Sequence, residues 1–310
     1  MRPNCSKSFR EVLVLALAFS CAITPARTTL AQSSSLGKGQ VVTRVPQPDH
    51  IVIVIEENKA YKQIIGNMAA QYINHLANEG ALFTQSFGVA HPSQPNYLAL
   101  FSGSTHGVPD DRCLRALTGE NLASELRKKG LTFAIYSESM HSVGYTGCEY
   151  GHYQRKHNPA VNWQGINVPP EMNMPFSMFP SDFSKLPTVS IVVPNQLNDM
   201  HDGEILDAII RGDRWLKENL DSYVQWAKTN NGLLIVTWDE DDDSSNNHIP
   251  TIFVGPMVKP GKYDNRIDHY NVLRTIEEMY GLSLMGRTIN ADPIKNTWNS
   301  AIASSKEKRQ

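Results

Sequence analysis

Residues 50–58 read His-Ile-Val-Ile-Val-Ile-Glu-Glu-Asn, an apolar run rich in β-branched side chains that stops at two acids and an amide. Such a run is typical of a strand buried on both faces of a sheet. Helical patterns separate most of the similar runs, for example residues 121–129, which stop at Gly130. The alternation predicts an α/β fold with a mostly parallel central sheet flanked by helices. The other predicted strands are residues 81–89, 132–136, 189–193, 233–237 and 251–254.

Polar residues follow the carboxyl end of four predicted strands. These ends meet at one edge of a parallel sheet, where proteins of this class bind ligands. One acidic strand end is usually a solvated loop, but four together predict a functional site. The residues expected there are Glu57, Asn58, His91, Ser93, Asn195, Asp199, His201, Asp202, Asp239 and Glu240.

The segment His-Pro-Ser-Gln-Pro-Asn-Tyr at residues 91–97 joins the apolar run 81–90 to an apolar stretch of helical length. Ser93 is therefore expected at a strand-to-helix turn, where free N–H groups and the helix dipole favour a phosphate and a serine alkoxide. Pro95 suits the first turn of a helix, because its missing N–H would have no partner there. The alternative is that Ser93 only caps the helix.

The chain has 310 residues, of which 41% are hydrophobic and 19% charged, as in one large globular domain. Basic residues precede an apolar run at 12–23, and residues 29–31 offer a cleavage site, which is the pattern of a secretory signal peptide. The run is short for a membrane span, so we expect no transmembrane anchor; a lipoprotein processed at Cys21 is the alternative. We expect a secreted or periplasmic protein with a signal peptide at 1–31, a linker at 32–49, a folded domain at 50–300 and a disordered tail at 301–310.

Residues 1–31 hold four of the 29 Lys/Arg residues and one of the 31 Asp/Glu residues, so the remaining chain has 25 basic and 30 acidic residues. Its net charge of −5 excludes the strongly basic class of nucleic-acid-binding proteins. Cys113 and Cys148 remain, and an even pair of cysteines in an exported protein is most simply a disulfide. A catalytic thiol is the competing interpretation.

The residues at the strand ends suit phosphoryl transfer. Carboxylate and amide oxygens hold a divalent cation, which lowers the pKa of a hydroxyl and neutralises phosphoryl oxygens. Ser93 would be the attacking hydroxyl. The ligand set does not distinguish calcium, magnesium, manganese and zinc. The predicted ligands are Glu57, Asn58, Asp239 and Glu240.

Two further segments leave alternatives open. In the acid run 239–243, the first two residues adjoin a predicted strand, whereas residues 241–243 lead into a polar loop. His248, beyond that loop, either faces the site or caps the loop. Residues 163–186 are rich in proline, methionine and phenylalanine, and form either a lid or pocket wall or a packed irregular excursion.

Five motifs resemble, in order, those of the bacterial exported phosphoesterase family, which contains acid phosphatases and phospholipase C-type enzymes within the alkaline phosphatase superfamily. The resemblance covers residues 50–282. Residues 59–61 read Lys-Ala-Tyr where larger phospholipase members have Arg-Ser-Phe, and Glu240 replaces a second aspartate, which favours a monoesterase. The motifs are Ile-Glu-Glu-Asn at 55–58, residues 91–97, Lys-His-Asn-Pro at 156–159, Asn-Asp-Met-His-Asp-Gly at 198–203 and Thr-Trp-Asp-Glu at 237–240.

The resemblance implies that Ser93 forms a phosphoserine intermediate, that the four predicted ligands hold a metal, and that His157 and His201 bind phosphate or assist the leaving group. We further expect a substrate-binding role for Asn96, Asp199, Asp202 and His248.

The predicted function is therefore that of an exported, acid phosphatase-like phosphomonoesterase acting on a small phosphate ester, with phospholipids and nucleotides among the candidates. A phosphodiesterase or phospholipase C-type enzyme is the close alternative. Rivals of another class are a non-catalytic lipid- or carbohydrate-binding protein on the same fold and a serine esterase that needs no metal.

Overall fold

The computed structural model describes residues 45–114 and 116–299. The predicted signal peptide at 1–31, linker residues 32–44 and the tail at 301–310 lie outside the described residues. Residues 45–49, assigned above to the linker, pack onto the domain: Val45 lies in the apolar core and Tyr280 Oη donates to the Pro48 oxygen over 3.0 Å. Across the described ranges, no helix combines the length and apolar character needed to cross a membrane.

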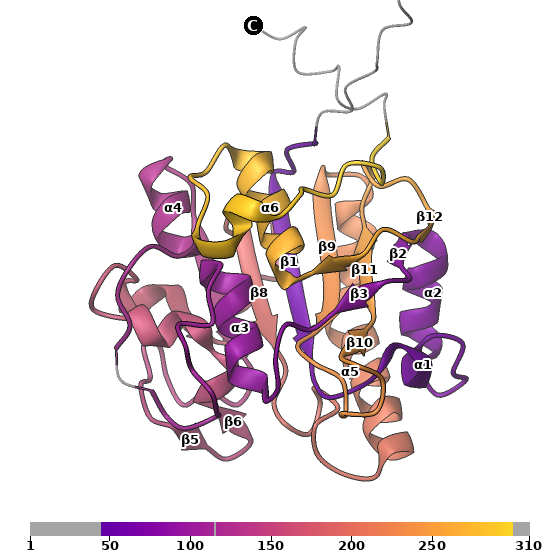
Figure 1. Cartoon of the computed structure of the whole chain (residues 1–310), viewed down its shortest axis with the longest axis horizontal. Helices are drawn as coiled ribbons and strands as arrows, with labels where there is room; N and C mark the ends of the chain where they lie inside the picture. The colour runs from indigo at the N-terminus through magenta and orange to yellow at the C-terminus, as the bar shows by residue number, and fades with distance from the viewer. Residues whose placement is uncertain (1–44, 115, 300–310) are drawn as a thin grey trace, which may run out of the picture. The chain divides into compact units, whose positions relative to one another are not determined.

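An eight-stranded sheet forms the centre of the domain, in the order β12-β2-β11-β9-β1-β8-β4-β7 (Figure 1). Neighbouring strands pair in parallel except for β11, which is antiparallel to both β9 and β2. The prediction of a mostly parallel α/β sheet is confirmed. The strands are β1 (His50–Glu56), β2 (Ala81–Phe83), β4 (Phe133–Ser137), β7 (Asn173–Pro175), β8 (Val189–Val193), β9 (Gly232–Trp238), β11 (Thr251–Val254) and β12 (Gly261–Tyr263).

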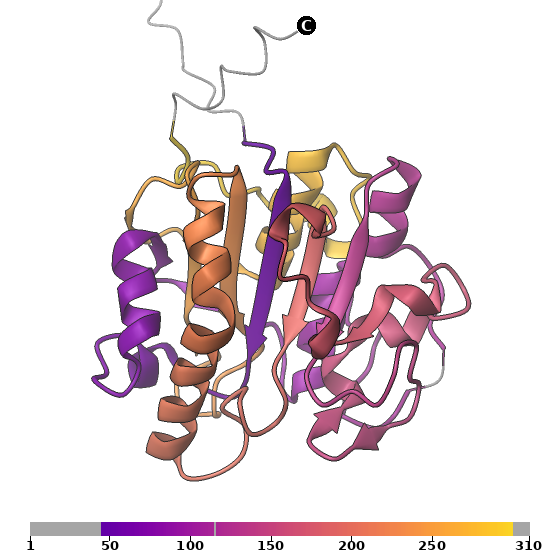
Figure 2. The same cartoon turned by 180° about the vertical axis from the view of Figure 1, so that it is seen from behind.

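Helices cover both faces of this sheet. One face is covered by α3, α4 and α6, and the opposite face by α2 and α5, which lie in front of the sheet in the reversed view (Figures 1 and 2). The α-helices are α1 (Tyr61–Ile64), α2 (Gln71–Glu79), α3 (Ser93–Ser102), α4 (Leu122–Lys128), α5 (Ile205–Ala227) and α6 (His269–Tyr280). Single 3₁₀ turns occur at Arg155–His157, Pro159–Trp163, Pro170–Met172, Phe176–Met178, Phe183–Lys185 and Gly286–Asn290.

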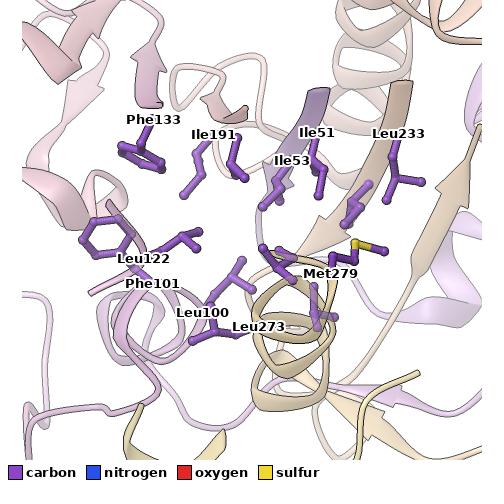
Figure 3. Packing of buried hydrophobic residues seen from close by; sticks show 14 of the residues in the cluster. Ile51, Ile53, Leu100, Phe101, Leu122, Phe133, Ile191, Leu233, Leu273 and Met279 are labelled. Carbon is purple, nitrogen blue, oxygen red and sulfur yellow. The ribbon is translucent and has the colours of Figure 1, made fainter. Parts of the chain in front are cut away.

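The sheet separates two apolar cores. Ile51 and Ile53 of β1 belong to the core under α3, α4 and α6, whereas Val52 and Val54 belong to the core under α2 and α5. Successive side chains of a strand point to opposite faces, so a strand covered on both sides needs an uninterrupted apolar run. Burial on both faces holds β1 at the centre of the sheet. Figure 3 shows the first core, with Ile51, Ile53, Ile191 and Leu233 of the sheet near Leu100, Leu273 and Met279 of the helices.

The predicted strand at 81–89 is wrong as one element. It divides into β2 and β3 (Ser86–Phe87), which belong to different sheets. Thr84 and Gln85 form the turn between them, and their backbone groups bond to Tyr263 and Ile267 instead of continuing one ladder. β3 pairs with β10 (His248–Ile249) and β13 (Ile267–Asp268), and a separate hairpin joins β5 (Glu149–Tyr150) to β6 (Tyr153–Gln154).

The other sequence elements agree with the structure. The predicted helix at 121–129 is α4, and Asn121 caps it by accepting a hydrogen bond from Ser124 N. Residues 163–186 form 3₁₀ turns and the edge strand β7, and the ring of Phe176 packs 5.1 Å from that of Trp215 on α5. These contacts favour the packed excursion over a lid.

Candidate active site

Ser93 is the first residue of α3 and is 1% exposed. Its Oγ lies 3.1 Å from Glu57 Oε2 and 2.9 Å from Glu240 Oε1. Pro92 occupies the cap position, so the Ser93 hydroxyl faces two carboxylates instead of capping the helix. A hydroxyl beside the positive end of a ten-residue helix is well placed to meet an anionic substrate.

Three buried carboxylates surround this hydroxyl. Glu57 follows β1 and Asp239 follows β9, and the parallel pairing of Glu56 with Trp238 sets the two strand ends side by side. One oxygen each from Glu57, Asp239 and Glu240 lies within 4.8 Å of the others. The structure thus brings together three of the four predicted ligands.

Asn58, the fourth predicted ligand, adopts a left-handed backbone with φ of 51°. Asparagine tolerates this conformation better than most residues. The turn directs Asn58 N to Asp239 Oδ1, 3.3 Å away. Among the described residues, the Asn58 side-chain amide has no hydrogen-bond partner, so its oxygen remains available to a ligand.

The carboxylates destabilise one another in their ionised forms. Burial, together with the charges of Glu57 and Glu240, raises the pKa of Asp239 well above its usual range. Burial and the charge of Glu57 raise the pKa of Glu240 to about 8. Asp239 Oδ2 has no hydrogen-bond partner among the described residues. A divalent cation would bind the unpartnered buried oxygen and neutralise the concentrated negative charge. These residues therefore fit a divalent cation.

Tyr97 and His157 hold the remaining oxygen of Glu57. Tyr97 Oη donates to Glu57 Oε1 over 2.9 Å, and His157 Nε2 lies 2.9 Å from the same oxygen. Burial alone raises the pKa of Glu57, but the charge and hydrogen bond of His157 outweigh it and bring that pKa to about 2. The rings of Tyr97 and His157 stack 5.1 Å apart, which holds the Tyr97 hydroxyl and the His157 ring beside Glu57.

His157 lies between two carboxylates. Its Nδ1 is 3.5 Å from Asp199 Oδ2, opposite the contact with Glu57. Burial lowers the pKa of His157, but the charges and hydrogen bonds of Glu57 and Asp199 raise it to about 9. Burial also raises the pKa of Asp199 to about 6. With both ring nitrogens facing carboxylates, His157 is placed to orient Glu57.

His201 occupies a more open position. Its Nδ1 lies 2.8 Å from Asp202 Oδ1, and its backbone N donates to Asp199 Oδ1 over 2.8 Å. The rings of His201 and His157 lie 6.2 Å apart, and no described residue hydrogen-bonds to His201 Nε2. Asp202 therefore orients a histidine whose second nitrogen is available for proton transfer.

Asn96 and His248, the other two predicted substrate-binding residues, also make their contacts within the protein. Asn96 Oδ1 accepts from Val89 N and Ala90 N, and its Nδ2 donates to Ala90 O and Pro92 O, which shapes the loop before Ser93. The His248 ring stacks on Tyr61 and Phe87, with Nε2 3.0 Å from Thr84 O. Of the two alternatives for His248, these contacts match the loop-supporting one.

Several site residues had no predicted role. Tyr97, Lys156 and His91 fall inside quoted motifs. His91, also expected at a strand end, places Nδ1 2.5 Å from Glu240 Oε2. Asp241 is buried and accepts from the N–H groups of Asp243, Ser245 and Asn247, so it organises the polar loop that follows. The motif positions of His91, Tyr97 and Lys156, and the place of His91 at a strand end, are the signals in the sequence for these residues.

Cys113 and Cys148 form the predicted disulfide, with an S–S distance of 2.02 Å. The bond joins the loop after α3 to the start of the β5–β6 hairpin. The 3₁₀ turn that follows this hairpin in the sequence carries His157. It therefore connects the two segments that flank Ser93 and His157 in the sequence.

Comparison with known proteins identifies the family of the chain. The sequence model described as "Phosphoesterase family" matches residues 68–283. The phosphatidylinositol-3-phosphatase of Mycobacterium tuberculosis (strain ATCC 25618 / H37Rv) is 49% identical over 263 residues, covering 84% of this chain and 86% of that protein. The phosphate-repressible acid phosphatase of Penicillium chrysogenum is 32% identical over 231 residues, covering 69% of this chain and 55% of that protein. The chain thus spans about half the length of this fungal relative.

The fold is similar to that of a protein of the alkaline phosphatase superfamily from Vibrio parahaemolyticus. The TM-score is 0.60, with 14% identity, and the alignment covers 82% of this chain and 72% of that chain. This likeness confirms the predicted fold type.

Proposed function

Because the chain belongs to the phosphoesterase family and is a hydrolase acting on phosphoric esters, we propose that it is a metal-assisted phosphomonoesterase with Ser93 as nucleophile. One observation carries the proposal: Ser93 Oγ, at the N-terminus of α3, lies within hydrogen-bond distance of both Glu57 and Glu240. A hydroxyl placed there can approach phosphorus while a neighbouring carboxylate accepts its proton.

Glu57, Asp239 and Glu240 would hold the divalent cation, with Asn58 as a further oxygen donor. The unpartnered Asp239 Oδ2 and the three mutually repelling carboxylates support this assignment. When bound, the cation supplies charge that lowers the pKa of the serine hydroxyl and neutralises the phosphoryl oxygens. Oxygen donors of this kind leave calcium, magnesium, manganese and zinc as candidates.

The residues around Ser93 support a two-step reaction. In the first step, the Ser93 proton passes to Glu240 while Oγ attacks phosphorus. The bond from phosphorus to the ester oxygen breaks, and His201 Nε2 donates a proton to the departing oxygen. A phosphoserine and a free alcohol result.

In the second step, water attacks the phosphoserine and gives its proton to His201 Nε2. The P–Oγ bond breaks, phosphate leaves, and Glu240 returns the proton to Ser93. Tyr97, His157 and Asp199 keep Glu57 oriented throughout, and the positive end of α3 stabilises the phosphoryl oxygens.

The relative that shares 49% identity is named a phosphatidylinositol-3-phosphatase. On this basis we propose a phosphatidylinositol monophosphate as the candidate physiological substrate of this chain. The acid phosphatase names of other relatives support small phosphomonoesters as further substrates.

We also propose that the protein is exported. The Cys113–Cys148 disulfide supports this, because disulfides persist in oxidising compartments and are rare in the cytosol. Fusion of residues 1–31 to a reporter that is active only outside the cytoplasm tests the signal. Retention of that reporter in the cytoplasm would contradict export.

Hydrolysis of p-nitrophenyl phosphate and bis-p-nitrophenyl phosphate, with and without chelator, tests the proposed function. We expect monoester turnover that chelation abolishes, that added divalent cation restores, and that Ser93→Ala reduces by at least about a thousandfold. Ser102→Ala is a matched control, because Ser102 is buried at the other end of α3 and bonds to Leu98 O.

Preference for the diester would favour the phosphodiesterase alternative. Full turnover by Ser93→Ala would reject the nucleophile assignment, and turnover of carboxylic esters unaffected by chelator would favour the serine esterase. Release of phosphate from phosphatidylinositol 3-phosphate in vesicles, compared with the 4-phosphate and 5-phosphate, tests the narrower substrate assignment.

A further inference from the structure

Lys156 precedes His157 in the sequence, but the reaction described above gives it no role. Its side chain is 15% exposed, and its Nζ lies 2.8 Å from Asp111 Oδ2. A lysine this well covered loses side-chain freedom and part of its hydration. Lys156 is therefore not an ordinary solvated surface lysine.

Asp111 links Lys156 to the nucleophile segment. Asp111 Oδ1 accepts from the backbone N of Gln94 over 2.9 Å, and Gln94 directly follows Ser93. One carboxylate thus bonds both to the Lys156 ammonium and to the first turn of α3. The ammonium group is consequently held beside the turn that carries the attacking hydroxyl.

The charge of Lys156 acts on the carboxylates of the site. Burial lowers the pKa of Lys156, but the charges of Glu57, Asp111 and Asp239 raise it more strongly. Lys156 in turn opposes the rise in the pKa of Glu240. Lys156 is therefore a cation within electrostatic range of the cluster around Ser93.

The loop that carries Asp111 is firmly held. The buried Gln94 side chain donates from Nε2 to Asp110 O and Arg112 O, each over 2.9 Å. Two residues after Asp111, Cys113 bonds to Cys148, and the Cys148 oxygen accepts from Arg155 N over 2.9 Å. Both members of the Lys156–Asp111 pair are thus anchored close to one disulfide.

We propose that Lys156 binds a non-bridging oxygen of the substrate phosphoryl group and thereby selects phosphomonoesters over phosphodiesters. This proposal rests on the proposed Ser93 phosphatase. A monoester has a second ionisation with a pKa of about 6, so it is largely a dianion at pH 7.5, whereas a diester remains a monoanion. A fixed ammonium group attracts the dianion more strongly.

The test compares Lys156→Gln with wild type on p-nitrophenyl phosphate and bis-p-nitrophenyl phosphate at pH 7.5. We expect kcat/KM for the monoester to fall about ten- to hundredfold and that for the diester to fall by less than about threefold. The inhibition constant of inorganic phosphate should rise about tenfold or more. This second readout decides the proposal even if the diester reacts too slowly to measure.

Lys228→Gln is the matched control, because Lys228 also pairs with a carboxylate, Glu79, over 2.6 Å, but at the C-terminal end of α5. Its variant should keep both activities. Lys156→Arg retains the charge and should preserve more monoester activity than Lys156→Gln. Should Lys156→Gln fail to fold, as judged by thermal unfolding, Lys156→Met removes the charge at similar length.

Equal losses on the two substrates, or an unchanged inhibition constant for phosphate in a folded variant, would overturn the proposal. Failure of the underlying phosphatase assignment has a different signature. In that case Ser93→Ala retains turnover, whatever Lys156→Gln does.

Discussion

His269 Nε2 lies 2.7 Å from the backbone oxygen of Asp239. His269 is the first residue of α6, which packs over the central sheet. Asp239 is the first residue after β9. Because a carbonyl oxygen can only accept, Nε2 carries the proton. One buried hydrogen bond therefore ties the helix layer to the cluster of carboxylates.

Replacing His269 tests whether that bond positions the cluster. His269→Leu removes the donor and leaves Asp239 O without this partner, so we expect divalent-cation affinity to fall by about tenfold. Glutamine can place an amide N–H near the position of Nε2, so His269→Gln should retain most of the affinity. Isothermal titration calorimetry with magnesium and calcium measures both variants. Equal affinity of His269→Leu and wild type would show that the bond only supports the fold.

Tyr97→Phe removes the Oη donor to Glu57 Oε1 and keeps the ring that stacks on His157. Loss of a hydrogen bond to a buried carboxylate destabilises its ionised form by about 1.5 to 3 kcal/mol. We therefore expect kcat for p-nitrophenyl phosphate to fall about tenfold or more, with a smaller change in KM. Tyr223→Phe is the control, because Tyr223 is equally buried but donates to Leu233 O. Comparable losses in the two variants would point to a general packing effect.

Removing the disulfide should weaken both the fold and the site. The two cysteines are 35 residues apart in the sequence, and cross-linking a loop of this size stabilises a protein by about 3 to 4 kcal/mol. We expect the variant with Cys113→Ser and Cys148→Ser to lose about this free energy of unfolding in urea, and to lose monoester activity because the Asp111 loop is released. Reductant should lower the stability of the wild type but not that of the double variant. Unchanged urea midpoints would contradict the prediction.

Glu277 makes the stability depend on pH. It is fully buried, and burial raises its pKa from 4.5 to about 7, although Thr288 Oγ1 and Met285 N donate to Oε1. The folded protein therefore keeps this proton after the unfolded chain has released it. The contribution of Glu277 to the free energy of unfolding is fully present below about pH 4.5 and declines as the pH rises to about 7. Above that pH it is constant, and the total loss is up to about 3 kcal/mol.

Glu277→Gln should remove this dependence of the free energy of unfolding on pH between about 4.5 and 7, and should make the protein more stable than wild type at pH 8. Urea unfolding at several pH values from 4.5 to 8 measures the difference. The control is Glu278→Gln, because Glu278 is a partly exposed neighbour that pairs with Arg274 over 2.8 Å. A profile of Glu277→Gln parallel to that of wild type would contradict the assignment.

The strand ends of the site were predictable because they follow a local rule. Apolar runs of strand length identify β1 and β9, and the residues after parallel strands share an edge, so Glu57 and Asp239 could be expected together. The 91–97 segment likewise indicated a serine at the start of a helix. The error at residues 81–89 has the same origin, because an apolar pattern reports β-structure but not which sheet each part joins.

The sequence by itself determined the α/β architecture, the acidic strand ends and the position of Ser93, because alternating apolar runs and turn residues act over a few neighbours. Only the tertiary structure decided which side chains meet: His269 with Asp239, Tyr97 with Glu57, and Lys156 with Asp111. These pairs are 30 to 45 residues apart in the chain. Their contacts depend on how the helices and loops pack against the sheet, which no local pattern encodes.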